Sequence, residues 1–256
     1  MVPMIQELVV AGIGAVVGVI IFVVGARVWP SGWQRAHEES AGELVLDLVK
    51  TFFVAVVAFV VVLGWQQYDN AESHTITEAK GLVGTYWLAH DLPDPAHQRI
   101  QGLVRQYTNE VLDREWSLMD REHRLDPAAQ TTLTSLAEAV AEIPTADPGA
   151  SDVRSKVFDN VGQVVQARQD RAADAARSVP EFLMIALYVG TALVLVSPVL
   201  SGFRITRSTI MMMALLGVVI GSVLLQIHNL DHPFSGQTVV PRGAFEDAQS
   251  AYGQIN

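Results

Sequence analysis

The sequence contains no cysteine among its 256 residues, which excludes disulfide bonds, thiolate metal ligands and a thiol nucleophile. Charged residues are also scarce: they make up 17% of the chain, whereas 50% of the residues are hydrophobic and the mean hydropathy is +0.29. Such a composition is too apolar for an ordinary water-soluble domain. The chain is therefore predicted to be a membrane protein.

Basic residues are the scarcer of the two charge types, 17 against 27 acidic ones, so the net charge is −10. A chain of this charge lacks the basic surface that binds the phosphates of nucleic acid or of anionic lipid. The sequence also lacks glycine-rich nucleotide-binding motifs, lipidation signals and a recognisable Ser–His–Asp triad. We therefore expect no nucleic-acid partner, no cofactor and no enzymatic activity.

Four apolar segments are long enough to cross a bilayer, because about 30 Å of hydrocarbon requires roughly 20 helical residues. One of them, residues 44–65, contains two charged residues, Asp47 and Lys50. A cleaved signal peptide is the alternative for the first segment, but Glu7 occupies the place of the usual basic residues. The other three segments contain no charge, and they are residues 8–26, 182–203 and 208–227.

These segments predict an all-α membrane protein with four transmembrane helices. Residues 1–65 hold the first two, and residues 182–227 hold the third and fourth. A soluble insert of residues 66–181 separates the pairs, and its 11 basic and 19 acidic residues give it 11 − 19 = −8 of the net charge. Residues 228–256 form a tail that stays close to the membrane.

The insert is predicted to be helical. Asp94–Pro95 and Asp126–Pro127 each have the pattern of an N-cap followed by proline in the first helical position. No helix breaker precedes Gly81, so the second span is expected to continue into the insert as one long helix. Apolar residues at three- and four-residue spacing predict two further amphipathic helices. The first set is Ile100, Leu103, Val104, Tyr107, Val111 and Leu112, and the second is Val153, Val157, Phe158, Val161, Val164 and Val165.

The second span carries polar and small residues on one face. Asp47, Thr51, Ala55 and Ala58 are spaced by four, four and three residues, which places them along one side of a helix. An ionisable side chain inside a membrane usually faces the interior of a helix bundle or water, so these residues are candidates for the lining of a pore. Alternatively, Asp47 and Lys50 extend to the headgroups and the alanines allow close helix packing.

Histidine and aspartate residues directly follow the fourth span. His228, Asp231 and His232 could hold a metal if the helix continued, but Pro233 is expected to end it, so no metal site is predicted. We expect a C-terminal latch instead, in which Asp231 accepts backbone N–H groups beyond the turn and Phe234 is buried against residues 65–68. The residues of this latch are Asp231, His232, Pro233, Phe234 and Gly236.

Two motifs resemble the bestrophins. The valine run and helix exit at 60–70, with Trp65, Gln67, Tyr68 and Asp69, are similar to the end of the bestrophin pore-lining helix. The segment 230–236, Leu-Asp-His-Pro-Phe-Ser-Gly, resembles the bestrophin Asn-Pro-Phe-Gly segment after the fourth span. Residues 1 to 250 more closely resemble the uncharacterised bestrophin-like family of bacterial four-span membrane proteins. The further motifs of this resemblance are Glu78-Ala79, Leu92-Pro93-x-Pro95 and Glu115-Trp116-x-x-Met119.

The resemblance implies a bestrophin-like helical fold that forms a pentamer, with a pore for inorganic ions lined by the second helix. Two features depart from bestrophin channels. Their large apolar neck residues correspond to positions near Asp47, Thr51 and Ala55, so the hydrophobic gate is not reproduced. Gln237–Val240 stand where bestrophins carry an acidic calcium clasp, and we therefore predict no calcium site.

Two considerations disagree on orientation in the cell (inner) membrane. The positive-inside rule favours a cytoplasmic location for the short loops, whose arginines are Arg27, Arg35, Arg204 and Arg207. The insert side also carries basic residues near the spans: Lys80, Arg168, Arg171, Arg177 and Arg242. Bestrophins keep the insert in the cytosol, and this resemblance slightly favours the same orientation here.

The sequence thus favours a homo-oligomeric, channel-like protein of the lipid bilayer. The alternative from another functional class is a non-conducting membrane scaffold or accessory subunit, whose acidic insert docks a partner.

Overall fold

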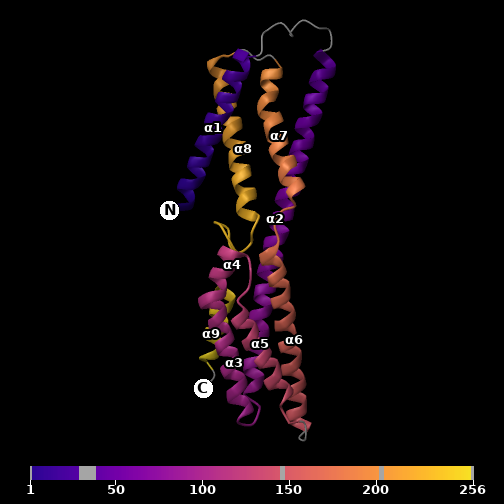
Figure 1. The fold of residues 1–256 in the computed structure, drawn as a ribbon, viewed down its shortest axis with the longest axis vertical. Coiled ribbons are helices and arrows are strands. Elements are labelled where there is room, and N and C mark those ends of the chain that lie inside the picture. Colours follow the sequence, from indigo (N-terminus) through magenta and orange to yellow (C-terminus); the bar gives the residue numbers. More distant parts are fainter. Residues whose placement is uncertain (1, 29–38, 145–147, 202–204, 255–256) are drawn as a thin grey trace. The chain divides into compact units, whose positions relative to one another are not determined.

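A computed structural model describes residues 2–28, 39–144, 148–201 and 205–254, and these residues contain helices and no strand (Figure 1). The all-helical class predicted from the sequence is therefore confirmed. The elements, in chain order, are α1 (Val2–Val28), α2 (Glu39–Ala89), α3 (Ala96–Glu110), the π-helical turn η2 (Val111–Glu115), α4 (Trp116–Glu122), α5 (Pro127–Ala141), α6 (Pro148–Ala176), α7 (Glu181–Leu200), α8 (Arg207–Leu230) and α9 (Gly243–Tyr252).

Four helical stretches are long and apolar enough to cross a membrane, as predicted. They lie in α1, in the first part of α2, in α7 and in α8. Pro180 is the N-cap of α7, and α8 ends at Leu230, three residues after the predicted boundary. The prediction that the second span continues into the insert is also confirmed, because α2 is one helix of 51 residues.

The chain divides into two compact units. The first comprises residues 1–65 and 178–231, and the second comprises residues 66–177 and 232–256. In the first unit, α1 and α8 pack closely because glycines face each other: a Cβ atom on Gly14 would lie 2.3 Å from the carbonyl oxygen of Gly217. Phe22, Met213 and Val199 are buried beside this crossing. Small residues of this kind allow two membrane helices to approach closely.

The second unit has a conventional apolar core. Most members of the two predicted stripes are buried in it or packed against it, including Ile100 and Val104 on α3 and Val157 and Val161 on α6. Phe158 is the exception, because its side chain is 57% exposed. The prediction for Phe158 was wrong because it lies one position beyond the buried row of α6.

One of the two predicted helix starts is correct. Asp126 caps α5 by accepting a hydrogen bond from Ala128 N at 2.9 Å, and Pro127 is the first helical residue. At the other site the proline itself is the N-cap, so α3 starts at Ala96, and no side chain caps it. Pro93 O accepts the backbone N–H groups of Ala96 and His97, which makes an Asp94 cap unnecessary.

Candidate functional site

The polar face of α2 is uncovered by the helices of its own chain. Asp47, Thr51, Ala55 and Ala58 are all exposed. Lys50 Nζ donates a hydrogen bond to the Asp47 carboxylate at 3.1 Å, and the Thr51 hydroxyl donates to Asp47 O at 2.8 Å. The Asp47 side chain is nevertheless 76% exposed. This face can therefore meet lipid, water or another copy of the chain.

The opposite face of α2 holds the helix in its bundle. Val60 is 1% exposed and packs with Leu187 and Ile227, and Phe53 borders the same apolar cluster. The ring of Phe53 lies against Gly190 of α7, where an added Cβ would meet Phe53 Cδ2 at 2.4 Å. These contacts fix which face of α2 turns inward within the first unit, and they leave the polar face outward.

The residues at the predicted helix exit differ in their surroundings. Trp65 and Asp69 are exposed, whereas Gln67 and Tyr68 are half-buried. Among the described residues, no partner reaches the buried Oε1 atom of Gln67. Burial, followed by the negative charge of Glu72, raises the pKa of Tyr68.

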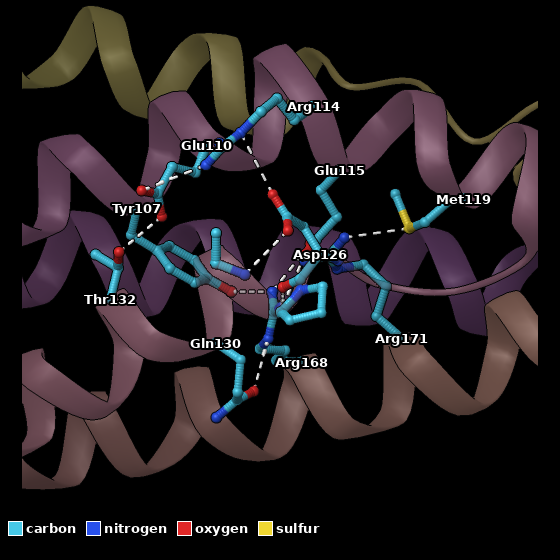
Figure 2. Close-up of polar contacts among 12 residues, drawn as sticks. Tyr107, Glu110, Arg114, Glu115, Met119, Asp126, Gln130, Thr132, Arg168 and Arg171 are labelled. Atoms are coloured by element: carbon cyan, nitrogen blue, oxygen red, sulfur yellow. Dashed lines mark hydrogen bonds and ion pairs between the residues drawn. The ribbon is translucent and has the colours of Figure 1, made fainter.

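A buried charge cluster that was not predicted lies in the second unit, and Figure 2 shows its Glu115, Arg168 and Arg171. Arg168 binds Glu115 through two hydrogen bonds, from Nη1 to Oε1 at 2.9 Å and from Nη2 to Oε2 at 2.7 Å. Arg171 donates to Glu115 Oε1 at 2.6 Å and to both oxygens of Glu78, at 2.7 and 2.9 Å. The four side chains are at most 3% exposed. Two acids thus balance two bases.

Neutral groups make further hydrogen bonds to the charged side chains of the cluster. The Tyr107 hydroxyl donates to Glu78 and accepts Nη1 of Arg168 at 2.8 Å. Glu115 also accepts the backbone N–H of Asp126 at 2.9 Å. Such satisfaction matters because an unpaired buried charge costs several kcal/mol.

The electrostatics favour the charged forms. Burial alone would raise the pKa of Glu115, but Arg171 and Arg168 hold that pKa below its ordinary value. Burial alone would lower the pKa of Arg171, yet Glu78 and Glu115 raise it well above the usual range. Burial and Glu78 raise the pKa of Tyr107 well above its ordinary value. At neutral pH, Glu115 and Arg171 are therefore ionised and the Tyr107 phenol is protonated.

The π-helical turn η2 places Glu115 in this cluster. Tyr107, Val111, Glu115 and Met119 are all buried, and they are separated by four residues each. In a regular α-helix this spacing drifts by about 40° per step, so Met119 would turn away from the core. A wider π-turn at Val111–Glu115 takes up the extra residue and keeps all four side chains on one face.

The sequence contained one signal for this cluster. The buried row of α6 continues from Val157, Val161 and Val164 to Arg168 and Arg171 with the same four- and three-residue spacing. Charged residues on an apolar stripe indicate buried ion pairs. From the sequence, Arg168 and Arg171 were interpreted only as basic residues near a span, and their burial shows a role in the core that this interpretation did not include. Arg35 and Arg204 lie outside the described residues.

The C-terminal segment after α8 is tightly packed. Pro233 and Phe234 are buried, and the Phe234 ring meets Trp116 edge-on at 6.0 Å, in a cluster that Tyr68 borders. Gly236 has a φ of 89°, which glycine adopts without strain. The His232 ring lies 4.3 Å from that of His123. In the described residues, no three histidine or acidic side chains are arranged to bind a metal.

Asp231 accepts a backbone N–H, but from an unexpected donor. Its Oδ1 atom lies 2.6 Å from Val179 N, which precedes it by 52 residues, whereas the sequence analysis placed the donor beyond the turn. Pro180 follows Val179 and begins α7. Asp231 therefore ties the end of α8 to the start of α7 within the first unit.

Helix α9 covers the charge cluster. The Phe245 ring centroid lies 5.5 Å from the guanidinium carbon of Arg171. Tyr252 stacks on Tyr86 with the ring centroids 4.5 Å apart, and its hydroxyl lies 3.0 Å from that of Thr108. The tail is thus an integral part of the second unit.

Comparisons with known proteins agree with this fold. The structure is similar to a variant of a bacterial bestrophin homologue from Klebsiella pneumoniae, with 12% identity, 94% of this chain and 97% of that chain covered, and a TM-score of 0.73. Another crystal structure of the Klebsiella pneumoniae homologue gives the same identity and coverage and a TM-score of 0.70. No curated protein matches the sequence. The sequence matches the Bestrophin-like domain over residues 12–245. Because that match spans most of its length, the chain belongs to the Bestrophin-like family.

Proposed function

We propose that the chain assembles into a closed ring, a pentamer by analogy with bestrophins, and conducts ions along a path lined by α2. One observation carries this proposal: the face with Asp47, Thr51, Ala55 and Ala58 is uncovered in the single chain, although it belongs to an apolar span. An acidic side chain in such a span is costly against lipid. A shared aqueous axis provides the environment that Asp47 requires.

The proposed path favours cations. Five Asp47 carboxylates around one axis would create a negative potential at a pore mouth, which attracts cations and repels anions. Lys50 pairs with Asp47 at 3.1 Å and offsets part of this potential, but the Asp47 side chain is more exposed than that of Lys50, 76% against 43%. Small side chains at Thr51 and Ala55 leave the path wide where bestrophins carry large apolar residues.

We test conduction in liposomes that contain the purified protein. Asp47→Asn is expected to lower the preference for cations over anions, because it removes the charge and keeps the shape of the side chain. Ala55→Trp is expected to block flux by filling the path. Val45→Trp is the matched control, because Val45 is exposed on α2 outside the polar stripe, about 160° around the helix from Asp47. Wild-type protein that passes no ion at any voltage or pH would favour the scaffold function.

The ring itself is tested by native mass measurement in detergent or nanodiscs. A closed ring is expected because one four-span chain leaves the polar face of α2 without partners. A monomer would contradict the proposal.

We also propose that the segment from Asp231 to Gly236 acts as a latch that stabilises the assembled particle. The buried Phe234 and the bond from Val179 N to Asp231 support this role. Asp231→Ala and Phe234→Ala are each expected to lower the stability of the particle by about 1 to 3 kcal/mol per chain. Gln249→Ala serves as a control, since Gln249 is exposed on α9. Two results together would indicate a metal site in place of the latch. A chelator would lower the stability of the particle, and one bound metal per chain would be lost in Asp231→Ala.

A further inference from the structure

Two aromatic side chains stand out on the surface of the helical insert. Trp87 on α2 is 51% exposed and Phe158 on α6 is 57% exposed. Among the described residues of the second unit, the only other exposed large hydrophobic side chain is Val239, at 39%. The rest of the insert surface is rich in acidic residues. Large apolar side chains on an otherwise charged surface indicate a protein contact.

The two aromatics lie at nearly the same height along the helices. Helices α2 and α6 are antiparallel where they touch, because Gly81 contacts Asn160 and Val164 while Gly84 contacts Asn160. Trp87 follows Gly84 by three residues, about 4.5 Å of helix rise, and Phe158 precedes Asn160 by two residues, about 3 Å. Because the helices are antiparallel, both residues are displaced from the Gly84–Asn160 contact in the same direction along the helix axis. The heights of Trp87 and Phe158 therefore differ by roughly 1.5 Å.

Equal height is the condition for contact in a ring. A rotation about an axis parallel to these helices preserves the height of every residue, so a ring contact joins two different surfaces at the same level. Trp87 and Phe158 belong to different helices and meet this condition.

The charges beside the two aromatics are complementary. Asp91 is exposed one turn beyond Trp87, and Arg154 lies one turn from Phe158 on the same face of α6 and in the same direction along the helix axis. The Arg154 guanidinium donates to Ala141 O at 3.2 Å and to Val140 O at 3.3 Å, and these carbonyl groups do not neutralise its charge.

We propose that Trp87 of one copy of the chain packs against Phe158 of the next copy, so that these two surfaces form a contact between neighbouring inserts. The inference rests on the ring assembly of the proposed function. It specifies a head-to-tail contact, in which each copy offers its Trp87 surface to one neighbour and its Phe158 surface to the other.

Cross-linking tests this contact, because the native chain contains no cysteine and only the introduced thiols can react. His90→Cys and Ser155→Cys place thiols beside Trp87 and Phe158 and keep both aromatics. With a short bismaleimide, the double variant is expected to give a ladder of covalent oligomers up to the closed ring. Each single variant alone is expected to remain uncross-linked. Adding Trp87→Ser to the double variant is expected to reduce the ladder strongly.

The control pairs His90→Cys with Gln163→Cys, which is exposed on another side of α6. It is expected to cross-link weakly. A ring that is intact by native mass but gives no ladder overturns this contact and leaves the proposed function standing. Cross-linking of either single variant indicates a like-with-like contact and also overturns it. A monomeric particle overturns both the contact and the ring.

Discussion

At the scale of single residues, the buried charges of the second unit are the most sensitive feature. Glu78, Glu115, Arg168 and Arg171 balance one another, and Tyr107 completes their hydrogen bonds. A buried ion pair is a weak source of net stability, but removal of one partner leaves a charge without compensation. The cluster therefore makes the core intolerant of single substitutions at these positions.

Arg171→Met is expected to destabilise the second unit by about 3 to 5 kcal/mol, because it leaves two carboxylates in the core with one guanidinium between them. Thermal unfolding followed by circular dichroism measures the loss. Arg114→Met is the control: Arg114 is 55% exposed and lies 3.5 Å from Glu110 and 3.4 Å from Asp126, so the loss of these long ion pairs is expected to cost below about 1 kcal/mol. Equal losses in the two variants would contradict the importance of the buried cluster.

The phenol of Tyr252 makes stability depend on alkaline pH. Burial raises its pKa to about 12, so from about pH 10 upward the folded state holds a proton that the unfolded state releases. The stabilisation that Tyr252 contributes is fully present below the ordinary tyrosine pKa. It is lost as the pH rises toward the pKa of Tyr252 in the folded state. Urea unfolding is expected to show a loss of at most about 2 to 3 kcal/mol from this group.

Tyr252→Phe separates this effect from general alkaline damage. The variant loses the contact with Thr108 at every pH, but its further loss of stability above about pH 10 is expected to be smaller than in the wild type. An identical pH dependence in both proteins would show that Tyr252 does not contribute.

At the scale of elements, hydrophobic periodicity predicted most of the helices, since burial on one face is what the pattern records. The continuation of α2 through Gly81 and the start of α5 at Asp126 followed from local signals. The π-turn could not be predicted in this way, because its cause is tertiary: Glu115 must reach Arg168 and Arg171, which are more than 50 residues away. The donor to Asp231 was missed for the same reason.

Removal of one residue from η2 tests this explanation. Deletion of the exposed Asp113 converts the four-residue step from Val111 to Glu115 into a three-residue step, which a regular α-helix accommodates on the same face. We therefore expect the deletion variant to fold with a thermal midpoint close to that of the wild type.

Deletion of the exposed Ser117, in the regular helix α4, is the matched control. It rotates Met119 by about 100° away from the core and is expected to lower the midpoint clearly. If the two deletions were equally harmful, the π-turn would be needed for more than the register of the buried side chains.

At the scale of the whole molecule, orientation in the membrane decides which solution the acidic insert meets. The short-loop side carries four basic residues and the insert side carries five near the spans: Arg27, Arg35, Arg204 and Arg207 against Lys80, Arg168, Arg171, Arg177 and Arg242. Arg168 and Arg171 still count, although they are buried after folding, because the positive-inside rule acts during insertion. Because the two counts are nearly equal, the charge bias is close to nil, and only the bestrophin resemblance slightly favours a cytosolic insert.

Single cysteines at exposed sites decide between the two orientations, because the native chain contributes no thiol. In intact spheroplasts, a membrane-impermeant maleimide is expected to label Ser201→Cys, which follows α7 on the short-loop side, and to leave Gln163→Cys in the insert unlabelled. Once the membrane is permeabilised, both positions are expected to react, since both are exposed. Labelling of Gln163→Cys alone in intact spheroplasts would indicate the opposite orientation. In that orientation, the mouth of the proposed path beside Asp47 faces the cytosol.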